Sequence, residues 1–152
     1  MRGVKISGKL KLDIYTPAGE LRDTTGWLQN TITNTGLAQM ALLGGVASAV
    51  PFTYLALGVS ATAEHASATA LYGEITADIY RSAATVSRVT TDETNDTLQL
   101  YKVWTASATH AIEEVGIFNA SAAGTMLGRK LTTSKTVDNG ETLTGTYKVK
   151  FA

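Results

Sequence analysis

The clearest pattern in the chain is an alternation of apolar and polar residues near its start. The apolar positions of one face are Val4, Ile6, Leu10, Leu12 and Ile14. The positions between them are charged or polar, and they are Lys5, Ser7, Lys9, Lys11 and Asp13. Because the side chains of a strand point to alternate faces, this period of two predicts a long strand with one buried face. Residues 142–151 repeat the pattern and predict a second strand of the same kind.

Turn-forming residues divide the rest of the chain into further candidate strands. A turn is expected at residues 17–19, after which residues 21–32 should return as a strand with Trp27 at its centre. Residues 83–91 are rich in Thr, Val and Ser, and residues 97–105 alternate apolar with polar side chains. Because a Thr-Asn-Asp turn separates them, these two segments predict a second hairpin.

One short helix is expected in this β-rich chain. It runs from about residue 36 to residue 43, since Asn34 or Thr35 can cap its first amides and two glycines from Gly44 can end it. A helix of this length is marginal alone, so it should pack on the sheet. Tight turns without crossover helices favour antiparallel strands. We therefore predict a mainly β protein, with residues 1–152 forming a single antiparallel β-sandwich domain.

Residues 111–131 form the most informative stretch of the chain. One face of its first strand is expected to carry Ile112, Glu114, Gly116 and Phe118, and the other face Glu113, Val115 and Ile117. Apolar side chains on both faces are typical of a central strand. Small residues at 119–124 predict a turn into Met126, Leu127 and Arg129. We expect a hairpin in which Glu114 pairs with Arg129 across the two strands.

This hairpin resembles the C-terminal half of a family of small structural proteins of tailed bacteriophages. In that family an E-x-G-[IL]-F segment, a small-residue turn and an [ML]-L-x-R segment recur together. The resemblance extends to residues 30–43 (NTITNTGLAQMALL), 54–58 (YLALG) and 69–74 (TALYGE), and Arg81 stands where the family often has a basic residue. The resemblance implies a virion protein of the tail-fibre, tail-collar or decoration type.

Composition narrows the range of partners and compartments. The 152 residues include 13 Lys and Arg against 13 Asp and Glu, so no net positive charge favours nucleic acid as a partner. The absence of cysteine excludes disulfides and thiolate chemistry. No apolar run approaches the roughly 20 residues that span a bilayer, and the N-terminus lacks the apolar segment of a signal peptide. We expect no membrane partner, and synthesis in the host cytoplasm without export.

No group of residues predicts a catalytic centre. His110 lies near Glu113 and Glu114, but on a strand His110 and Glu114 stand about two pleats apart, too far for one metal ion. His110 is therefore interpreted as a turn residue. An acidic cluster consists of Asp92, Glu93 and Asp96. It is typical of a solvated turn, with a weak calcium site as the alternative. We expect no catalytic, cofactor-binding or metal-binding residues and no enzymatic activity.

Exposed positions instead suggest contacts with other proteins. Lys5, Lys9 and Lys11 line the polar face of the first predicted strand. They either keep a strand edge from pairing with other chains or dock on an acidic neighbouring subunit. Tyr54 and Tyr72 are further candidates for an interface. The two tryptophans are expected to pack in the core or in a hairpin rather than to serve as ligand platforms.

Together with the resemblance to the phage family, these features favour a non-enzymatic virion protein that works by self-association and by docking on other virion proteins. Capsid decoration is the favoured role, because the chain is one short domain without a fibrous repeat or a receptor-binding extension. The alternatives are a tail-collar, neck or fibre-attachment subunit, and a module that binds host glycans. A homo-oligomer is expected, with the major capsid protein or tail and neck subunits as partners.

Overall fold

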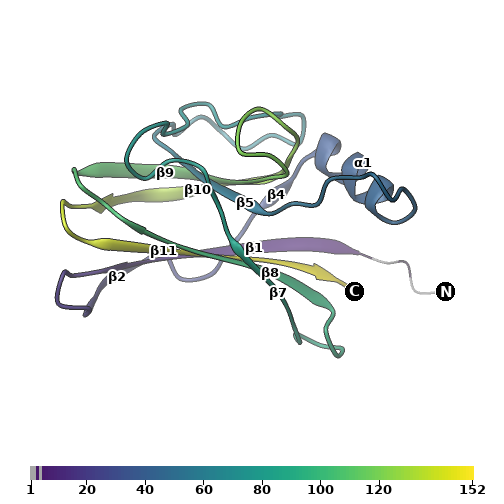
Figure 1. Ribbon diagram of the computed structural model, residues 1–152, viewed down its shortest axis with the longest axis horizontal. Coiled ribbons are helices and arrows are strands. Elements are labelled where there is room, and N and C mark those ends of the chain that lie inside the picture. The colour runs from purple at the N-terminus through teal and green to yellow at the C-terminus, as the bar shows by residue number, and fades with distance from the viewer. Residues whose placement is uncertain (1–2, 4) are drawn as a thin grey trace.

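The computed structural model describes residue 3 and residues 5–152, and it consists of two antiparallel sheets stacked as a sandwich (Figure 1). Sheet A contains, in spatial order, β2 (Leu21–Thr24), β1 (Ile6–Tyr15), β11 (Thr142–Phe151), β8 (Thr97–Thr105) and β7 (Thr85–Val89), with β3 (Leu28–Gln29) also beside β1. Sheet B contains β4 (Thr31–Ile32), β10 (Met126–Val137), β9 (His110–Phe118), β5 (Tyr54–Gly58) and β6 (Ser82–Ala83). The predicted mainly β sandwich is confirmed. Val4 of the first predicted strand lies outside the described residues.

The main core lies between the two sheets. β1 and β11 pair along their whole length, with Leu10 opposite Tyr147. Their inward side chains are buried as the alternation predicted, and they are Leu10, Leu12, Ile14, Leu143, Tyr147 and Val149. Asn30, which separates β3 from β4, donates a hydrogen bond from its amide to the Tyr147 hydroxyl. Burial raises the pKa of that hydroxyl well above its usual range.

Residues 21–32 do not form the single strand expected from the sequence. Gly26 adopts a positive φ of 62°, which turns the chain between β2 and β3, and Asn30 then separates β3 from β4. The first two pieces lie beside β1, while β4 crosses to sheet B and pairs with Gly128 and Arg129 of β10. Trp27 lies next to this turn and is 43% exposed, so it does not lie in the core, and its ring packs instead against side chains of β1.

A second, smaller core lies on the outer face of sheet B. Its buried members are Ala56, Ala68, Leu71, Phe118 and Met126, and Tyr54 packs against them. The segment between β5 and β6, residues 59–81, supplies Ala68 and Leu71. We call it the covering segment, because it covers this face of the sheet above β5, β9 and β10 (Figure 1). Sheet B is therefore buried on both faces, which explains the apolar residues on both sides of β5 and β9.

The hairpin of β9 and β10 is confirmed, but one residue faces the other way from the prediction. Ile112 joins Val115 and Ile117 in the core between the sheets, whereas Phe118 lies in the outer core. The pairing between β9 and β10 shifts between Leu131 and Lys135. A bulge of this kind changes the face to which the following side chains point, and simple alternation cannot detect it.

Helix α1 (Asn34–Leu43) lies at one end of the sandwich and packs on β10 (Figure 1). It begins slightly earlier than predicted, because the Thr33 hydroxyl caps it by accepting a hydrogen bond from the amide of Gly36 at 2.9 Å. Gly44 ends the helix as predicted. Met40 and Leu43 pack against the main core, whereas Leu37 and Leu42 remain exposed.

Gly36→Ala is expected to destabilise the protein by about 1–3 kcal/mol, because a β-carbon there would overlap backbone rather than a movable side chain. That β-carbon would lie 2.6 Å from both the Cα and the carbonyl oxygen of Leu127 in β10. Gly45→Ala is the matched control, since its β-carbon would meet nothing within 4 Å. Urea unfolding measures both variants, and equal midpoints for the two would contradict close packing of α1 on β10.

Candidate functional site

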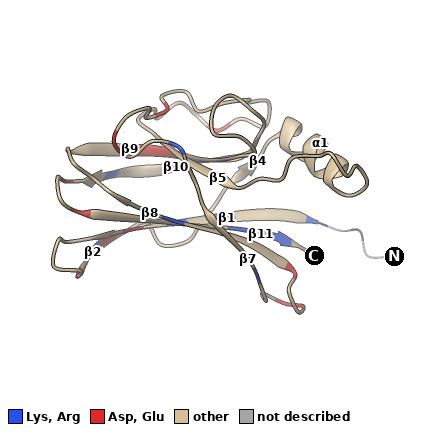
Figure 2. Ribbon diagram, in the orientation of Figure 1, with Lys and Arg blue, Asp and Glu red and all other residues tan. Residues whose placement is uncertain are grey.

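The three predicted interface lysines belong to the outer face of sheet A. Lys9 and Lys11 alternate along β1 with the buried residues Leu10 and Leu12, and Lys5 precedes the strand and is exposed. β1 lies inside the sheet, because β2 and β3 flank it on one side and β11 on the other. Protection of a sheet edge is therefore the wrong interpretation for Lys9 and Lys11. Figure 2 shows basic segments near the start of β1 and on β11.

Three lysines of this face contact the ring of Trp27. The Nζ atoms of Lys9, Lys11 and Lys148 lie 4.8, 5.4 and 5.2 Å from the centroid of its ring. Lys9 and Lys148 are directly opposite each other on β1 and β11. The negative face of the indole offsets repulsion between these ammonium groups, which explains how they share one small area. The other tryptophan, Trp104, is buried as predicted.

The two predicted interface tyrosines lie on the opposite side of the sandwich. Tyr54 alternates along β5 with the core residue Leu55, so it belongs to the outer face of sheet B, where it is half-buried. Tyr72 is 53% exposed, and the guanidinium carbon of Arg129 lies 4.7 Å from the centroid of its ring. The structure therefore does not bring the tyrosines and the lysines together in one surface. Their role in interfaces remains a prediction.

A buried ion pair holds the covering segment onto sheet B. Arg129 Nε lies 2.5 Å from Glu114 Oε2, and both side chains are almost fully buried, as the sequence predicted for this pair. Glu114 also accepts hydrogen bonds from the amides of Gly73, at 2.7 Å, and Tyr72, at 3.2 Å. Arg129 donates to the carbonyl oxygen of Ala63 at 3.3 Å. The pair thus ties the β9–β10 hairpin to the loop that follows β5.

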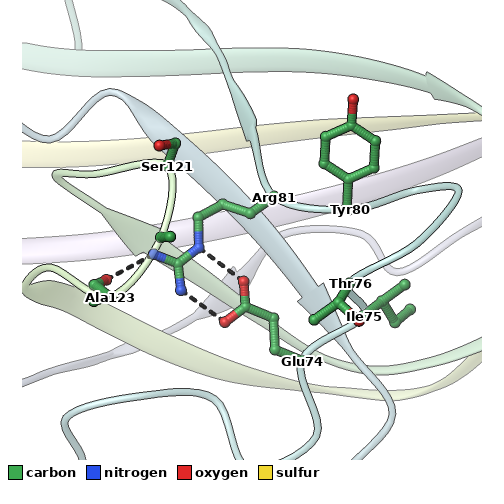
Figure 3. A pocket seen from close by; sticks show the side chains of 8 residues that line it. Glu74, Ile75, Thr76, Tyr80, Arg81, Ser121 and Ala123 are labelled. Atoms are coloured by element: carbon green, nitrogen blue, oxygen red, sulfur yellow. Dashed lines mark hydrogen bonds and ion pairs between the residues drawn. The ribbon is translucent and has the colours of Figure 1, made fainter.

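A second ion pair stands at the other end of the covering segment (Figure 3). Arg81 Nε and Nη2 donate to the two carboxylate oxygens of Glu74 at 2.8 and 2.6 Å. Arg81 Nη1 donates to the carbonyl oxygens of Ala120 and Ala123 at 3.1 and 2.8 Å. Its guanidinium carbon lies 3.6 Å from the centroid of the Phe118 ring. Arg81 therefore links the turn of the hairpin to the covering segment, a contact that the sequence analysis missed.

A surface cavity of about 340 Å³ opens beside the Glu74–Arg81 pair. It is lined by Glu74, Ile75, Thr76, Tyr80, Arg81 and residues 121–123, and the Tyr80 ring points away from the ion pair (Figure 3). The guanidinium group is already satisfied by one carboxylate and two carbonyl oxygens. An anionic ligand would have to displace Glu74, so this arrangement supports the loop rather than a binding role.

His110 is not a turn residue, contrary to the sequence interpretation. It begins β9, and its Nε2 lies 2.7 Å from Asp78 Oδ2. The same carboxylate accepts hydrogen bonds from the Ser107 hydroxyl at 2.7 Å and from the Ala108 amide at 3.2 Å. The hydrogen bond from Ser107 and then the contact with His110 lower the pKa of Asp78 to about 2. Asp78 thus anchors its loop to the turn before β9.

Lowering the pH from about 4 to about 2 is expected to remove the contribution of the Asp78 carboxylate to the stability of the fold. The folded-state pKa of about 2 lies below the ordinary value of 3.8. A carboxylate with such a lowered pKa stabilises the fold above its unfolded-state pKa and loses that effect as the pH falls towards the folded-state value. Asp78→Asn should lower the urea midpoint at neutral pH, and its difference from the unchanged protein should shrink by pH 2.

Glu20→Gln is the control for this pH dependence, because Glu20 is exposed and forms no ion pair with a described residue. Other carboxylates also titrate in this range, and the difference between the protein with and without Asp78 isolates the one group. An equal midpoint difference at neutral pH and at pH 2 would show that the loss comes from altered packing rather than from the charge.

In the acidic turn between β7 and β8, the carboxylate of Asp96 stabilises the backbone of the turn. Asp96 accepts hydrogen bonds from the amides of Thr91, at 2.8 Å, Asp92, at 3.0 Å, and Glu93, at 3.1 Å. Asp92 in turn pairs with Lys150 of β11. These contacts agree with the interpretation of the cluster as a turn. Within the described part of the chain, no group of three His, Asp or Glu side chains is arranged to hold a metal ion.

The motifs of residues 114–118 and 126–129 thus lie in paired strands, and their charged members form the buried Glu114–Arg129 pair. Over residues 26–148 the sequence matches a model of the family described as podophage GP4 fiber I protein gp80. The chain belongs to this family. It is accordingly a structural protein of a tailed-phage virion. A search of curated proteins and a search of solved structures each found no significant match.

The gp80-family match covers most of the surfaces described above. Its range contains both ion pairs of sheet B, Tyr54, Tyr72 and Trp27, whereas Lys5, Lys9 and Lys11 precede it. The matched range therefore includes the covering segment and the strands to which it is tied. Among the described residues, no helix is both long enough and apolar enough to cross a membrane.

Proposed function

We propose that this member of the gp80 family is a structural subunit of a tail fibre or of the site where a fibre attaches. The observation that carries the proposal is the match over residues 26–148 to a family described as a fibre protein. It supports a fibre or fibre-attachment role over capsid decoration, and the sequence analysis held the fibre-attachment subunit as an alternative. A role in capsid decoration stays a prediction from the sequence.

The proposed mechanism is contact between subunits, and the end of the sandwich near α1 suits that role. Residues 34–52 contain no charged side chain. Four large apolar residues of this segment are between 45% and 52% exposed, and they are Leu37, Leu42, Val46 and Val50. An exposed apolar surface of this kind supports docking on another virion subunit or on a second copy of the chain. A homo-oligomer is part of the proposal.

The proposal includes no enzymatic activity. The buried carboxylate of Glu114 is engaged by Arg129 and two amides, and Glu74 is engaged by Arg81. Asp78 is engaged by Ser107, Ala108 and His110. Each of these acidic groups stabilises a loop, which is the use expected of them in a structural subunit.

Separation of disrupted virions into heads and tails tests the proposed location. Quantitative mass spectrometry of the two fractions should find the protein enriched with the tail. Enrichment with the heads, together with rebinding of the purified protein to stripped capsids, would contradict the fibre role and restore capsid decoration. Light scattering of the purified protein tests self-association, and a monomer at high concentration would remove the homo-oligomer from the proposal.

A further inference from the structure

The outer face of sheet A has a small polar cavity where β1, β11 and the start of β8 meet. Its volume is about 150 Å³, and every side chain that lines it carries a hydrogen-bonding group. Its lining includes Ser7, Lys9, Gln29, Thr97, Lys148 and Lys150. A concave site lined by convergent polar groups is the kind of surface that binds a small ligand.

Two of the three lysines that line the cavity form no ion pair with a described residue. Lys150 pairs with Asp92, and the neighbouring Lys11 pairs with Asp13 at 3.1 Å. Lys9 and Lys148 form no ion pair with a described carboxylate. The cavity is therefore locally positive, although the chain as a whole has no net charge. Unpaired ammonium groups that converge on a concave site favour an anionic ligand.

Trp27 lies beside the cavity rather than in its lining, and its ring contacts two of the lining lysines. Its ring centroid lies 4.8 Å from Lys9 Nζ and 5.2 Å from Lys148 Nζ, and both lysines line the cavity. The side chain is 43% exposed, although it contacts the lysines. The part of the ring that the lysines leave uncovered offers an apolar surface next to charged and hydroxyl groups.

The combination fits one class of ligand better than its rivals. A sugar ring has an apolar face for Trp27, hydroxyl groups for Ser7 and Gln29, and, when it carries an acid, an anion for the lysines. Protein interfaces are depleted in lysine and serine at their centres, which disfavours an acidic protein as occupant. Nucleic acid requires many more cations than this face provides.

We propose that the cavity between β1, β11 and β8, together with Trp27, binds an anionic saccharide. Trp27 packs against the face of the sugar ring, and Lys9 and Lys148 hold its acidic group. The site lies on the side of the sandwich away from the covering segment of sheet B, so it remains accessible whether or not that covering segment contacts another subunit. The inference does not depend on where in the virion the protein is located.

Isothermal titration calorimetry on the intact chain tests this site with defined probes. The anionic probes are a galacturonate trisaccharide and a sulfated heparin tetrasaccharide, and the neutral probe is maltotriose. At least one anionic probe should bind more tightly than maltotriose. Lys9→Gln and Lys148→Gln should each weaken that binding about tenfold, because each removes a charge-assisted contact. Trp27→Ala should weaken it about fivefold by removing the apolar platform.

Lys102→Gln is the matched control, since it removes the same charge from β8 at a position outside the cavity. Urea midpoints verify that each variant is folded. Unchanged binding by Lys102→Gln supports the site, and an equal loss would overturn it as general charge attraction. Failure of both anionic probes to bind more tightly than maltotriose would also overturn it. Equally tight binding of a hexa-aspartate peptide would show instead that the face docks acidic proteins.

Discussion

Replacing Arg129 with alanine is expected to lower the free energy of unfolding by about 3–5 kcal/mol. The side chains of Arg129 and Glu114 are 1% and 0% exposed, so the substitution leaves a carboxylate buried without its cation. It also removes the hydrogen bond to the carbonyl oxygen of Ala63, which is one of the contacts between the covering segment and β10. Urea unfolding followed by tryptophan fluorescence measures the loss.

Two comparisons make this prediction specific to the buried pair. Lys135→Ala breaks a more exposed pair with Asp23 and should cost less than about 1 kcal/mol. The double variant Glu114→Ala with Arg129→Ala should cost much less than the sum of the two single changes, since each single change leaves one unpaired buried charge. Additive effects would show that the two groups do not interact, and equal effects of Arg129→Ala and Lys135→Ala would contradict the burial.

Phe118→Ala is expected to cost about 3–5 kcal/mol, because it leaves a cavity in the outer core of sheet B. Phe118 is 1% exposed and packs with Leu71 and Met126 in that core. Its ring also lies against the Arg81 guanidinium group, so its removal weakens the second point at which the covering segment is held. The urea midpoint and the yield of soluble protein should both fall.

Tyr101→Ala is the control for the loss of an aromatic ring, because Tyr101 is 42% exposed on the outer face of sheet A. Its free energy of unfolding should change by less than about 1 kcal/mol. A midpoint for Phe118→Ala close to that of the unchanged protein would show that Phe118 is exposed in solution. The hairpin would then project as an arm rather than form core structure.

The sequence predicted those parts of the fold that a local pattern specifies. Strict alternation defined β1 and β11, because each has one face in the core and one in solvent. The Glu114–Arg129 pair was predictable because two strands joined by a short turn bring fixed positions together. Alternation failed at Ile112, since the shifted pairing of β9 and β10 moves that side chain to the other face.

The remaining features depend on contacts between distant segments, which leave no local signal. Arg81 donates to the carbonyl oxygens of Ala120 and Ala123, which lie 39 and 42 residues further along the chain. Trp27 looked like the centre of a strand, but the turn at Gly26 places it over lysines from β1 and β11. The polar cavity of sheet A likewise combines residues of four segments, so its lining could not be predicted from spacing.

Immunogold electron microscopy of intact virions, with an antibody to this protein, tests the central claim most directly. The account predicts gold particles on the tail or its fibres, as expected for a structural subunit of the gp80 family. Label distributed over the head would contradict the fibre role. A virion that carries no label, when the antibody recognises the purified folded protein, would contradict the assignment to the virion itself.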